Sequence, residues 1–280
     1  MIGLFIREIE AAQGEGWRCH FLWVEQQAFQ RAGGLGVIRG VTESGSAVGS
    51  GSVGFDRFGL HFPPGRDVHR RAWVYWLGWS LSRLIFSTYF RWKAAGWEHV
   101  PREGPVIFAS NHASFADPPL LGAICPRPIS YLGRESLFAN PVTSWIFRSV
   151  GAVPVDRDGA SGKGLKTILD RLMGGDGIVL FPEGTRTRDG QFQPARAGVG
   201  LVVVKSGAPV VPARVFGTYD AFGKRHRFPR PRPVAVRLGS PLWFHAQIAE
   251  ASTAPRARVK EIYQEVADDI MKAIQRLERP

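Results

Sequence analysis

Short apolar runs alternate with helix-periodic segments from Pro101 onward. The apolar runs have the length of buried strands, and they lie at Val106–Ala109, Ile129–Leu132, Ala152–Val155, Ile178–Phe181, Val210–Val215 and Val234–Leu238. Helical spacing of apolar residues is found at Lys163–Met173, Val199–Lys205 and Arg256–Leu277. Alternating strands and helices predict an α/β fold with a central mixed, largely parallel sheet flanked by helices.

One of these predicted strands contains prolines. Pro209 precedes the run Val210–Val215, and Pro212 lies within it. Because proline has no backbone N–H to donate to a neighbouring strand, we expect this strand at an edge of the sheet or in an irregular position.

An aromatic segment, "RRAWVYWLGWSLSRLIFSTYFRWK", occupies Arg70–Lys93. Its apolar part, Ala72–Phe90, is barely long enough to cross a bilayer, which needs about 20 residues. The central Arg83 would cost roughly 2.5–3.5 kcal/mol there. Trp and Tyr flanked by basic residues favour an amphipathic helix in the membrane interface. The alternative is a helix that packs within a soluble domain. We predict a membrane-anchoring helix.

The N-terminal part is the least informative. Gly40–Phe55 is rich in Gly and Ser, which indicates a linker. Its G-x-G-x-x-G at Gly49, Gly51 and Gly54 follows no strand and opens no helix, so it does not indicate a dinucleotide site. We predict three parts: a poorly ordered extension at residues 1–67, the interfacial helix at 68–95 and a catalytic domain at 96–280.

Charge and cysteine content narrow the function classes. The 280 residues carry a net charge of +12, with a sequence pI of about 10.4. This balance suits nucleic acid, an anionic membrane or phosphorylated substrates. The cationic loop Lys224–Arg232 is accompanied by no RNA-binding, zinc-finger or basic-heptad motif, so nucleic acid is not expected. Cys19 and Cys125 form no C-x-x-C, which argues against a disulfide scaffold or a zinc ribbon.

Candidate chemistry begins at "FASNHASFADPPLL", Phe108–Leu121. On one helix His112 and Asp117 would point about 140° apart. Pro118 excludes such a helix anyway, so the chain must turn and can bring the carboxylate onto the imidazole. The carboxylate would fix the tautomer and leave the other ring nitrogen as a general base. Capping offers an alternative explanation, because Asp117 before proline is a good N-cap and Ser114 with Asp117 resembles a capping box.

Two further strands end in charged turns. "GAVPVDRDG" presents Arg157, and "IVLFPEGTRTRDG" presents Glu183, Gly184, Thr185 and Arg186. An arginine fork matches a phosphate, and glycine permits close approach of a ligand. Each turn alone would be an ordinary polar turn. In α/β sheets, however, ligands bind at the carboxyl ends of strands, where these turns are expected.

The motifs taken in series resemble those of the glycerolipid acyltransferases of the lysophosphatidic acid acyltransferase type. "NHASFADPP" resembles the N-H-x4-D motif, "GAVPVDR" the second, "FPEGTRT" the third and "APVVPARVFG" the fourth, in the family's order. The resemblance covers about Gly96–Leu242. Family members often carry lysines after the third motif, whereas here Arg196 stands in the stretch Gln193–Gly198.

The resemblance implies acyl transfer from a thioester, acyl-CoA or acyl carrier protein, to the free hydroxyl of a lysophospholipid. The favoured acceptor is 1-acyl-glycerol-3-phosphate, which gives phosphatidic acid. His112 and Asp117 are then the catalytic residues. The substrate-binding residues are Arg157, Glu183, Gly184, Thr185 and Arg186.

No cofactor or metal is expected, since the sequence holds no H-E-x-x-H, and the missing G-x-S-x-G favours direct attack by the acceptor over an acyl-enzyme. Because acceptor and product are lipids, we expect association with the anionic, cytoplasmic face of a membrane. The alternatives are another lysolipid acceptor, a hydrolase using the same pair to activate water, and a non-catalytic lipid-binding module.

Overall fold

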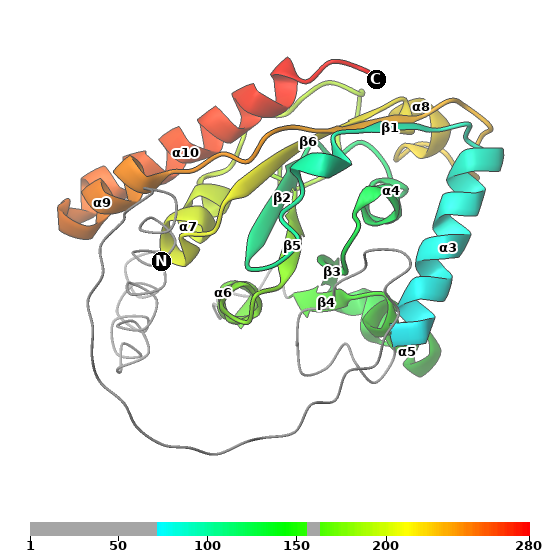
Figure 1. Cartoon of the computed structure of the whole chain (residues 1–280), viewed down its shortest axis with the longest axis horizontal. Helices are drawn as coiled ribbons and strands as arrows, with labels where there is room; N and C mark the ends of the chain where they lie inside the picture. Colours follow the sequence, from blue (N-terminus) through cyan, green and yellow to red (C-terminus); the bar gives the residue numbers. More distant parts are fainter. Residues whose placement is uncertain (1–71, 156–162) are drawn as a thin grey trace, which may run out of the picture. The chain divides into compact units, whose positions relative to one another are not determined.

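A mixed sheet of seven strands forms the centre of the described part of the chain. The computed structural model describes residues 72–155 and 163–280, so the predicted N-terminal extension lies outside the described residues. The strand order is β1-β7-β6-β2-β5-β3-β4, with β2 to β6 mutually parallel and β7 antiparallel to β6 (Figure 1). The strands are β1 Lys93–Ala95, β2 Val106–Ser110, β3 Ile129–Arg134, β4 Ala152–Val155, β5 Gly177–Leu180, β6 Val210–Phe216 and β7 Ala235–Leu238. The predicted fold class is confirmed.

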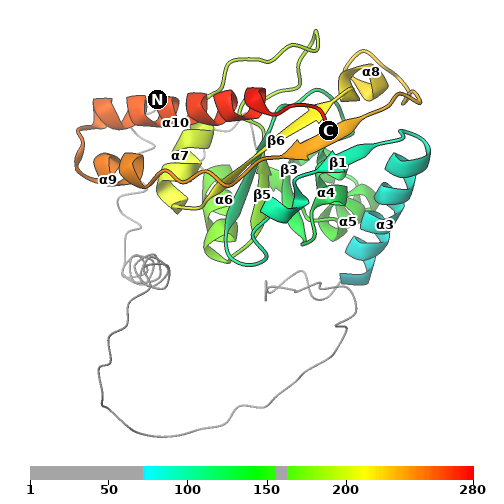
Figure 2. The same ribbon diagram turned by 45° about the horizontal axis from the view of Figure 1, so that its top comes forward.

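Helices cover both faces of the sheet (Figure 2). Helices α3 and α4 pack on one face, and α6, α7 and α10 pack on the other. The helices are α3 Ala72–Thr88, α4 Asp117–Ile124, α5 Pro141–Ser149, α6 Lys163–Met173, α7 Ala197–Ser206, α8 Thr218–Phe222, α9 His245–Thr253 and α10 Arg256–Arg276. Short 3-10 turns occur at Trp97–His99 and Glu135–Phe138.

Strand β2 lies near the middle of the sheet and carries the candidate site at its end. Val106 and Phe108 belong to the core on the α3/α4 side, whereas Ile107 and Ala109 belong to the core on the α7/α10 side. All four are fully buried. A strand covered on both faces must be apolar at consecutive positions, which explains the unbroken run in the sequence.

The prediction that the proline-containing strand lies at an edge is wrong. Strand β6 lies between β7 and β2. The β6–β7 pairing begins only at Ala213, and the carbonyl of Pro212 accepts a hydrogen bond from Gly239 N–H just beyond it (2.8 Å). The N and C=O of a strand residue point the same way. The missing N–H of Pro212 therefore faces β7 at the end of the pairing, opposite Gly239, where one hydrogen bond is lost and the rest of the ladder is kept.

Helix α3 has two different faces. On its inner face, Trp79 donates to the carbonyl of Cys125 (3.2 Å) and Arg83 to that of Ala123 (2.9 Å), so both side chains bind carbonyls at the C-terminal end of α4. Tyr75 and Phe86 are buried. The outer face exposes large apolar side chains, namely Trp73, Leu77, Leu81, Leu84 and Ile85. The helix thus combines the packing role and the exposed aromatic and aliphatic surface that the sequence offered as alternatives.

The segment after α3 departs from the predicted helix. The chain leaves the helix at Thr88, and Lys93–Ala95 pairs with β7 as the edge strand β1. In the described residues, no helix has the length and apolar character needed to cross a membrane.

Candidate active site

His112 is the second residue after β2, and the side chain of Asn111 fixes the position of this part of the chain. The Asn111 side chain accepts a hydrogen bond from Val215 N–H (2.9 Å) and donates to the Val215 carbonyl (3.2 Å). Through these two bonds, the Asn111 side chain extends the pairing of β2 with β6 beyond Ser110, the last residue of β2. The start of the His112 loop is therefore fixed relative to the sheet.

Asp117 meets the imidazole as the prolines predict. His112 Nδ1 lies 2.9 Å from Asp117 Oδ2, and the same oxygen accepts hydrogen bonds from the backbone N–H groups of Ala113 and Ser114 at 2.7 Å each. Asp117 is fully buried and is the first residue of α4. The partial positive charge of a helix N-terminus stabilises a carboxylate there. The capping alternative is wrong: the N-cap residue of α4 is Ala116, no side chain caps the helix, and the Asp117 carboxylate binds the loop and the histidine instead.

The arrangement leaves one ring nitrogen of His112 available. With Nδ1 donating to the carboxylate, Nε2 carries the lone pair, and it has no hydrogen-bond partner among the described residues. The ring stacks on Phe181, with centroids 3.8 Å apart and planes at 14°. The histidine side chain is 11% exposed. This is the geometry of a general base oriented by a carboxylate.

The turn after β5 holds the backbone of the same histidine. Strand β5 neighbours β2, so both strand ends lie at one edge of the sheet. The N–H of His112 donates to Glu183 Oε1 (3.3 Å), and its carbonyl accepts from Thr187 N–H (2.9 Å). The two turns are thus joined through the main chain of the candidate base.

Glu183 is a buried carboxyl group with an unusual pKa. It is only 3% exposed, and burial, together with the nearby Asp117, raises its pKa from 4.5 to about 7. Backbone hydrogen bonds from His112 and Gln193 offset part of this rise. The two carboxyl groups near His112, those of Asp117 and Glu183, therefore lie in different environments.

The tip of this second turn is more accessible. Thr185 is exposed, and the guanidinium of Arg186 lies over the ring of Phe115, 3.3 Å from its centroid. Gly184 has φ = +70°, and a Cβ built there would lie 2.9 Å from Cδ of Arg196. Arg196, which stands where relatives were expected to carry lysines, therefore lies beside the turn.

Most of the predicted site residues come together at this edge. His112, Asp117, Glu183, Gly184, Thr185 and Arg186 all lie in the two loops that follow β2 and β5. Arg157 falls outside the described residues. Sequence analysis gave no role to Asn111, Phe115 or Phe181, and their position inside the quoted motifs "NHASFADPP" and "FPEGTRT" was the signal that could have drawn attention to them. Within residues 72–155 and 163–280, no group of three or more His, Cys, Asp or Glu side chains is placed to bind a metal ion.

The fold and this edge define an α/β protein with a carboxylate-oriented histidine, and comparison with known proteins agrees with that class. A family model described as acyltransferase matches residues 91–215. The crystal structure of the 1-acyl-sn-glycerophosphate (LPA) acyltransferase PlsC from Thermotoga maritima superposes with a TM-score of 0.58 at 23% identity, covering 77% of this chain and 86% of that one. At this identity the likeness concerns the fold.

Sequence relatives establish the family. The 1-acyl-sn-glycerol-3-phosphate acyltransferase of Bacillus subtilis is 31% identical over 136 residues, which cover 48% of this chain and 67% of that protein. The chloroplastic enzyme of the same name from Brassica napus, BAT2, is 28% identical over 54% of this chain. A lyso-ornithine lipid O-acyltransferase of Pseudomonas aeruginosa is 26% identical over 49% of it. The chain belongs to the acyltransferase family. It matches 45% of the length of BAT2 and 52% of the Pseudomonas protein.

Proposed function

We propose that the protein is an O-acyltransferase that moves a fatty acyl group from a thioester to the hydroxyl of a lysophospholipid, with 1-acyl-glycerol-3-phosphate as acceptor and phosphatidic acid as product. The observation that supports it most is the His112–Asp117 pair at the end of β2, with Nε2 of His112 unbonded among the described residues and the arginine-bearing turn alongside. Family membership supports the same reaction class.

The proposed step is a direct attack on the thioester. His112 Nε2 takes the proton of the acceptor hydroxyl as its oxygen bonds to the carbonyl carbon. The tetrahedral intermediate then collapses, the C–S bond breaks, and the imidazolium returns the proton to the leaving thiolate. Asp117 stabilises the imidazolium through Nδ1. General base catalysis supplies roughly 10²–10⁴-fold, and positioning of the two substrates about 7–11 kcal/mol.

The acceptor phosphate is assigned to the turn after β5. Arg186 offers a planar fork for it and Thr185 a hydroxyl, and Arg157 is proposed as a further cation. Glu183 and Gly184 give the turn its shape. A relative that acts on lyso-ornithine lipid shows that the family also takes an acceptor of another kind, so a different lysolipid is the alternative acceptor.

The test is an acyl-transfer assay with a panel of lysolipids and with CoA and carrier-protein thioesters in parallel. We expect the highest kcat/KM with lysophosphatidate. A higher kcat/KM with lyso-ornithine lipid than with lysophosphatidate would make the lyso-ornithine lipid the assigned acceptor. Hydrolysis of the thioester at an equal rate without any acceptor would favour the hydrolase. The absence of any turnover would favour a non-catalytic lipid-binding module. Such a module would not explain the buried contact between Asp117 and His112.

We also propose that the outer face of α3 lies on an anionic membrane surface. Its exposed apolar side chains are joined by Val142 and Ile146 on α5, which packs against α3. The cationic loop Lys224–Arg232 lies next to the C-terminal end of α3, because the hydroxyl of Tyr89 donates to the Pro229 carbonyl (3.0 Å). Basic residues near an anionic leaflet, as on the cytoplasmic side, contribute about 1 kcal/mol each.

Sedimentation with anionic liposomes tests this surface. Deleting the whole aromatic segment would also remove Phe86 and Phe90 from the core, so point variants are sharper. We expect Leu77→Ser with Leu81→Ser to lower the bound fraction several-fold, and high salt to weaken binding of the wild-type protein. Met173→Ser, an exposed apolar site on α6, is the matched control. Equal loss with the control, or no loss with the pair, would contradict the proposal.

A further inference from the structure

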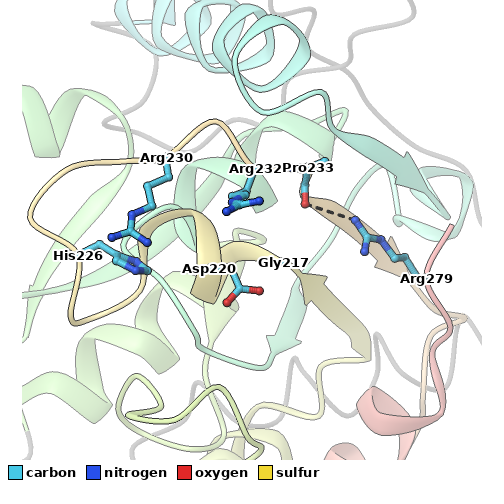
Figure 3. A pocket seen from close by; sticks show the side chains of 7 residues that line it. All are labelled: Gly217, Asp220, His226, Arg230, Arg232, Pro233 and Arg279. Atoms are coloured by element: carbon cyan, nitrogen blue, oxygen red, sulfur yellow. Dashed lines mark hydrogen bonds between the residues drawn. The ribbon is translucent and has the colours of Figure 1, made fainter.

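A second cationic site lies beside the end of β6, apart from the turn assigned to the acceptor. It is a pocket of about 350 Å³. Figure 3 shows Arg230 and His226 on one side of it, Arg279 from the C-terminal segment on the other, and Arg232 and Asp220 between them. The pocket volume falls within the usual range for small-molecule sites, about 300–1,000 Å³.

The charges of this pocket are poorly compensated by the protein. Across the described parts of the chain, the side chains of Arg230 and Arg232 form no hydrogen bond or ion pair. Arg279 donates only to the Pro233 carbonyl (3.3 Å). His226 Nδ1 is buried and has no partner there either. Three arginines and one lining carboxylate, that of Asp220, leave a net charge of +2 with the histidine neutral. Such a concave cationic site raises the local concentration of anions.

Helix α8 joins this pocket to the candidate active site. Asp220 on α8 lines the pocket. At the end of the same helix, the carbonyl of Phe222 accepts from Ser114 Oγ (2.7 Å), and the ring of Phe222 lies 5.5 Å from that of Phe115. Ser114 and Phe115 belong to the loop between His112 and Asp117. One short helix therefore separates the pocket from the loop that carries the candidate base.

We propose that this pocket binds the phosphate groups at the nucleotide end of a CoA thioester, the acyl donor. The proposal rests on the proposed function. In a CoA thioester the phosphates are separated from the reactive carbonyl by the pantetheine arm, so their binding site must be set apart from the base. The phosphate of a lysophosphatidate acceptor lies a few bonds from its hydroxyl and needs a cation beside the base, which Arg186 supplies.

The form of the pocket favours a small polyanion over a carrier protein. Arginine forks from the two sides of a concave site match a cluster of phosphate oxygens. A carrier protein would instead require an extended protein–protein contact. The bound anion would also offset the mutual repulsion of Arg230, Arg232 and Arg279.

Calorimetric binding of free CoA and of 3′-dephospho-CoA to the full-length protein tests the proposal. We expect the double variant Arg230→Gln, Arg232→Gln to bind CoA at least tenfold more weakly and to lose the wild-type preference for CoA over 3′-dephospho-CoA. The matched control is the pair Arg225→Gln, Arg227→Gln, because it removes the same two charges from exposed positions of the same loop outside the pocket. Melting curves check that both variants fold.

Kinetics give an independent measure. The double variant should raise KM for the CoA thioester tenfold or more, with kcat at saturating donor unchanged. Because the loop is also proposed to lie near the membrane, KM for the lysolipid should change no more than in the control pair. Binding also separates this proposal from the proposed function, since His112→Ala should bind CoA normally even though it is inactive. A protein that transfers no acyl group, yet loses CoA affinity in the double variant, would refute only the proposed function.

Three results would overturn the assignment. The first is unchanged CoA affinity in the double variant, and if that variant also loses binding to phosphatidate-containing liposomes, the pocket is a lipid headgroup site. The second is an equal loss of CoA affinity in the control pair Arg225→Gln, Arg227→Gln, which would indicate unspecific attraction. The third is the absence of CoA binding by a wild-type protein that uses carrier-protein donors.

Discussion

The loop after β2 and the turn after β5 lie side by side, yet they are built differently. In the first, Asp117 is fully buried and one of its oxygens accepts three hydrogen bonds from the loop itself. In the second, buried Glu183 is followed within two residues by an exposed Thr185. The first loop fixes one side chain rigidly, and the second presents groups outward. This division suits a catalytic base next to a binding surface.

The two regions are nevertheless coupled. Both backbone groups of His112 bind the turn after β5, through Glu183 and Thr187. Variants of the first loop should therefore affect the chemical step, variants at the tip of the second should affect acceptor binding, and variants at its buried start should affect the stability of both.

The largest expected effect follows from the first loop. We expect His112→Ala to lower kcat by roughly 10²–10⁴-fold with an unchanged melting temperature, because it removes the proposed base and leaves Asp117 bonded to two backbone N–H groups. Asp117→Asn should leave measurable activity, since it preserves the packing but not the charge that orients the imidazole. Acyl-transfer rates with saturating substrates measure both.

Asp117→Ala is a less informative variant. It leaves the buried N–H groups of Ala113 and Ser114 without their acceptor, at a cost of about 1–3 kcal/mol each. A loss of activity there would mix unfolding with chemistry. Near-normal turnover of His112→Ala would refute the assignment of the base.

The next largest effect concerns the tip of the second turn. We expect Arg186→Ala to raise KM for a phosphate-bearing acceptor about tenfold or more and to change KM for the donor little, because an arginine fork binds the phosphate in ground and transition states alike. Arg188→Ala, two residues along and exposed, is the matched control. If Arg186→Ala changed only the KM for the donor, the turn after β5 would have to be assigned to the acyl donor and not to the acceptor.

The sequence predicted the contacts of the loop after β2 more completely than those of the turn after β5. The prolines after Asp117 force a turn, and the partners of Asp117 are all within five residues, so local rules sufficed. The contact of His112 with Glu183 spans 71 residues, and the stacking on Phe181 depends on the adjacency of β2 and β5. No local pattern specifies such contacts.

The same limit explains the misplaced strand. The sequence rule predicts an edge position for any strand that contains proline, and it takes no account of how far the neighbouring strand extends. In β6, Pro212 is tolerated because it lies at the end of the pairing with β7, where its missing N–H costs a single hydrogen bond. For α3, periodicity could not reveal that Arg83 binds a carbonyl at the end of α4, since that partner lies 40 residues away.

The buried start of the second turn should give a smaller, pH-dependent effect. Glu183 has a pKa of about 7 in the folded protein and 4.5 as a free side chain. Between these values the unfolded chain has lost the proton that the folded protein retains, so stability falls as pH rises from 4.5 to 7. Glu183→Gln should therefore become more stable relative to wild type over this range, by about 1–3 kcal/mol.

Urea unfolding at pH 5 and pH 8 measures this difference. Asp189→Asn provides the control, because hydrogen bonds to its carboxylate, first from Gln191 N–H, hold the pKa of this exposed group below 3.8. Its contribution is lost only in acid, so the difference between this variant and wild type should not change from pH 5 to pH 8. A pH-independent difference for Glu183→Gln would show that the carboxyl group is already ionised at pH 5.

The smallest expected effect tests the backbone of the second turn. Gly184 has φ = +70°, where a side chain costs about 1–2 kcal/mol, so Gly184→Ala should lower the free energy of unfolding by about that amount. The added Cβ would also lie 2.9 Å from Cδ of Arg196, but that side chain is exposed and can move. Gly198→Ala, in helix α7 with no atom within 4 Å of the new Cβ, should be neutral or stabilising.

A double-variant cycle separates the two causes. If backbone strain dominates, Arg196→Ala will not restore the stability lost in Gly184→Ala, and the two changes will add within about 0.5 kcal/mol. Restoration by Arg196→Ala would instead show that the glycine serves to accommodate the arginine side chain. In that case Gly184→Ala should raise KM for the acceptor by displacing a cation beside the turn, and the comparison between the two loops would rest on Arg196 as well as on Arg186.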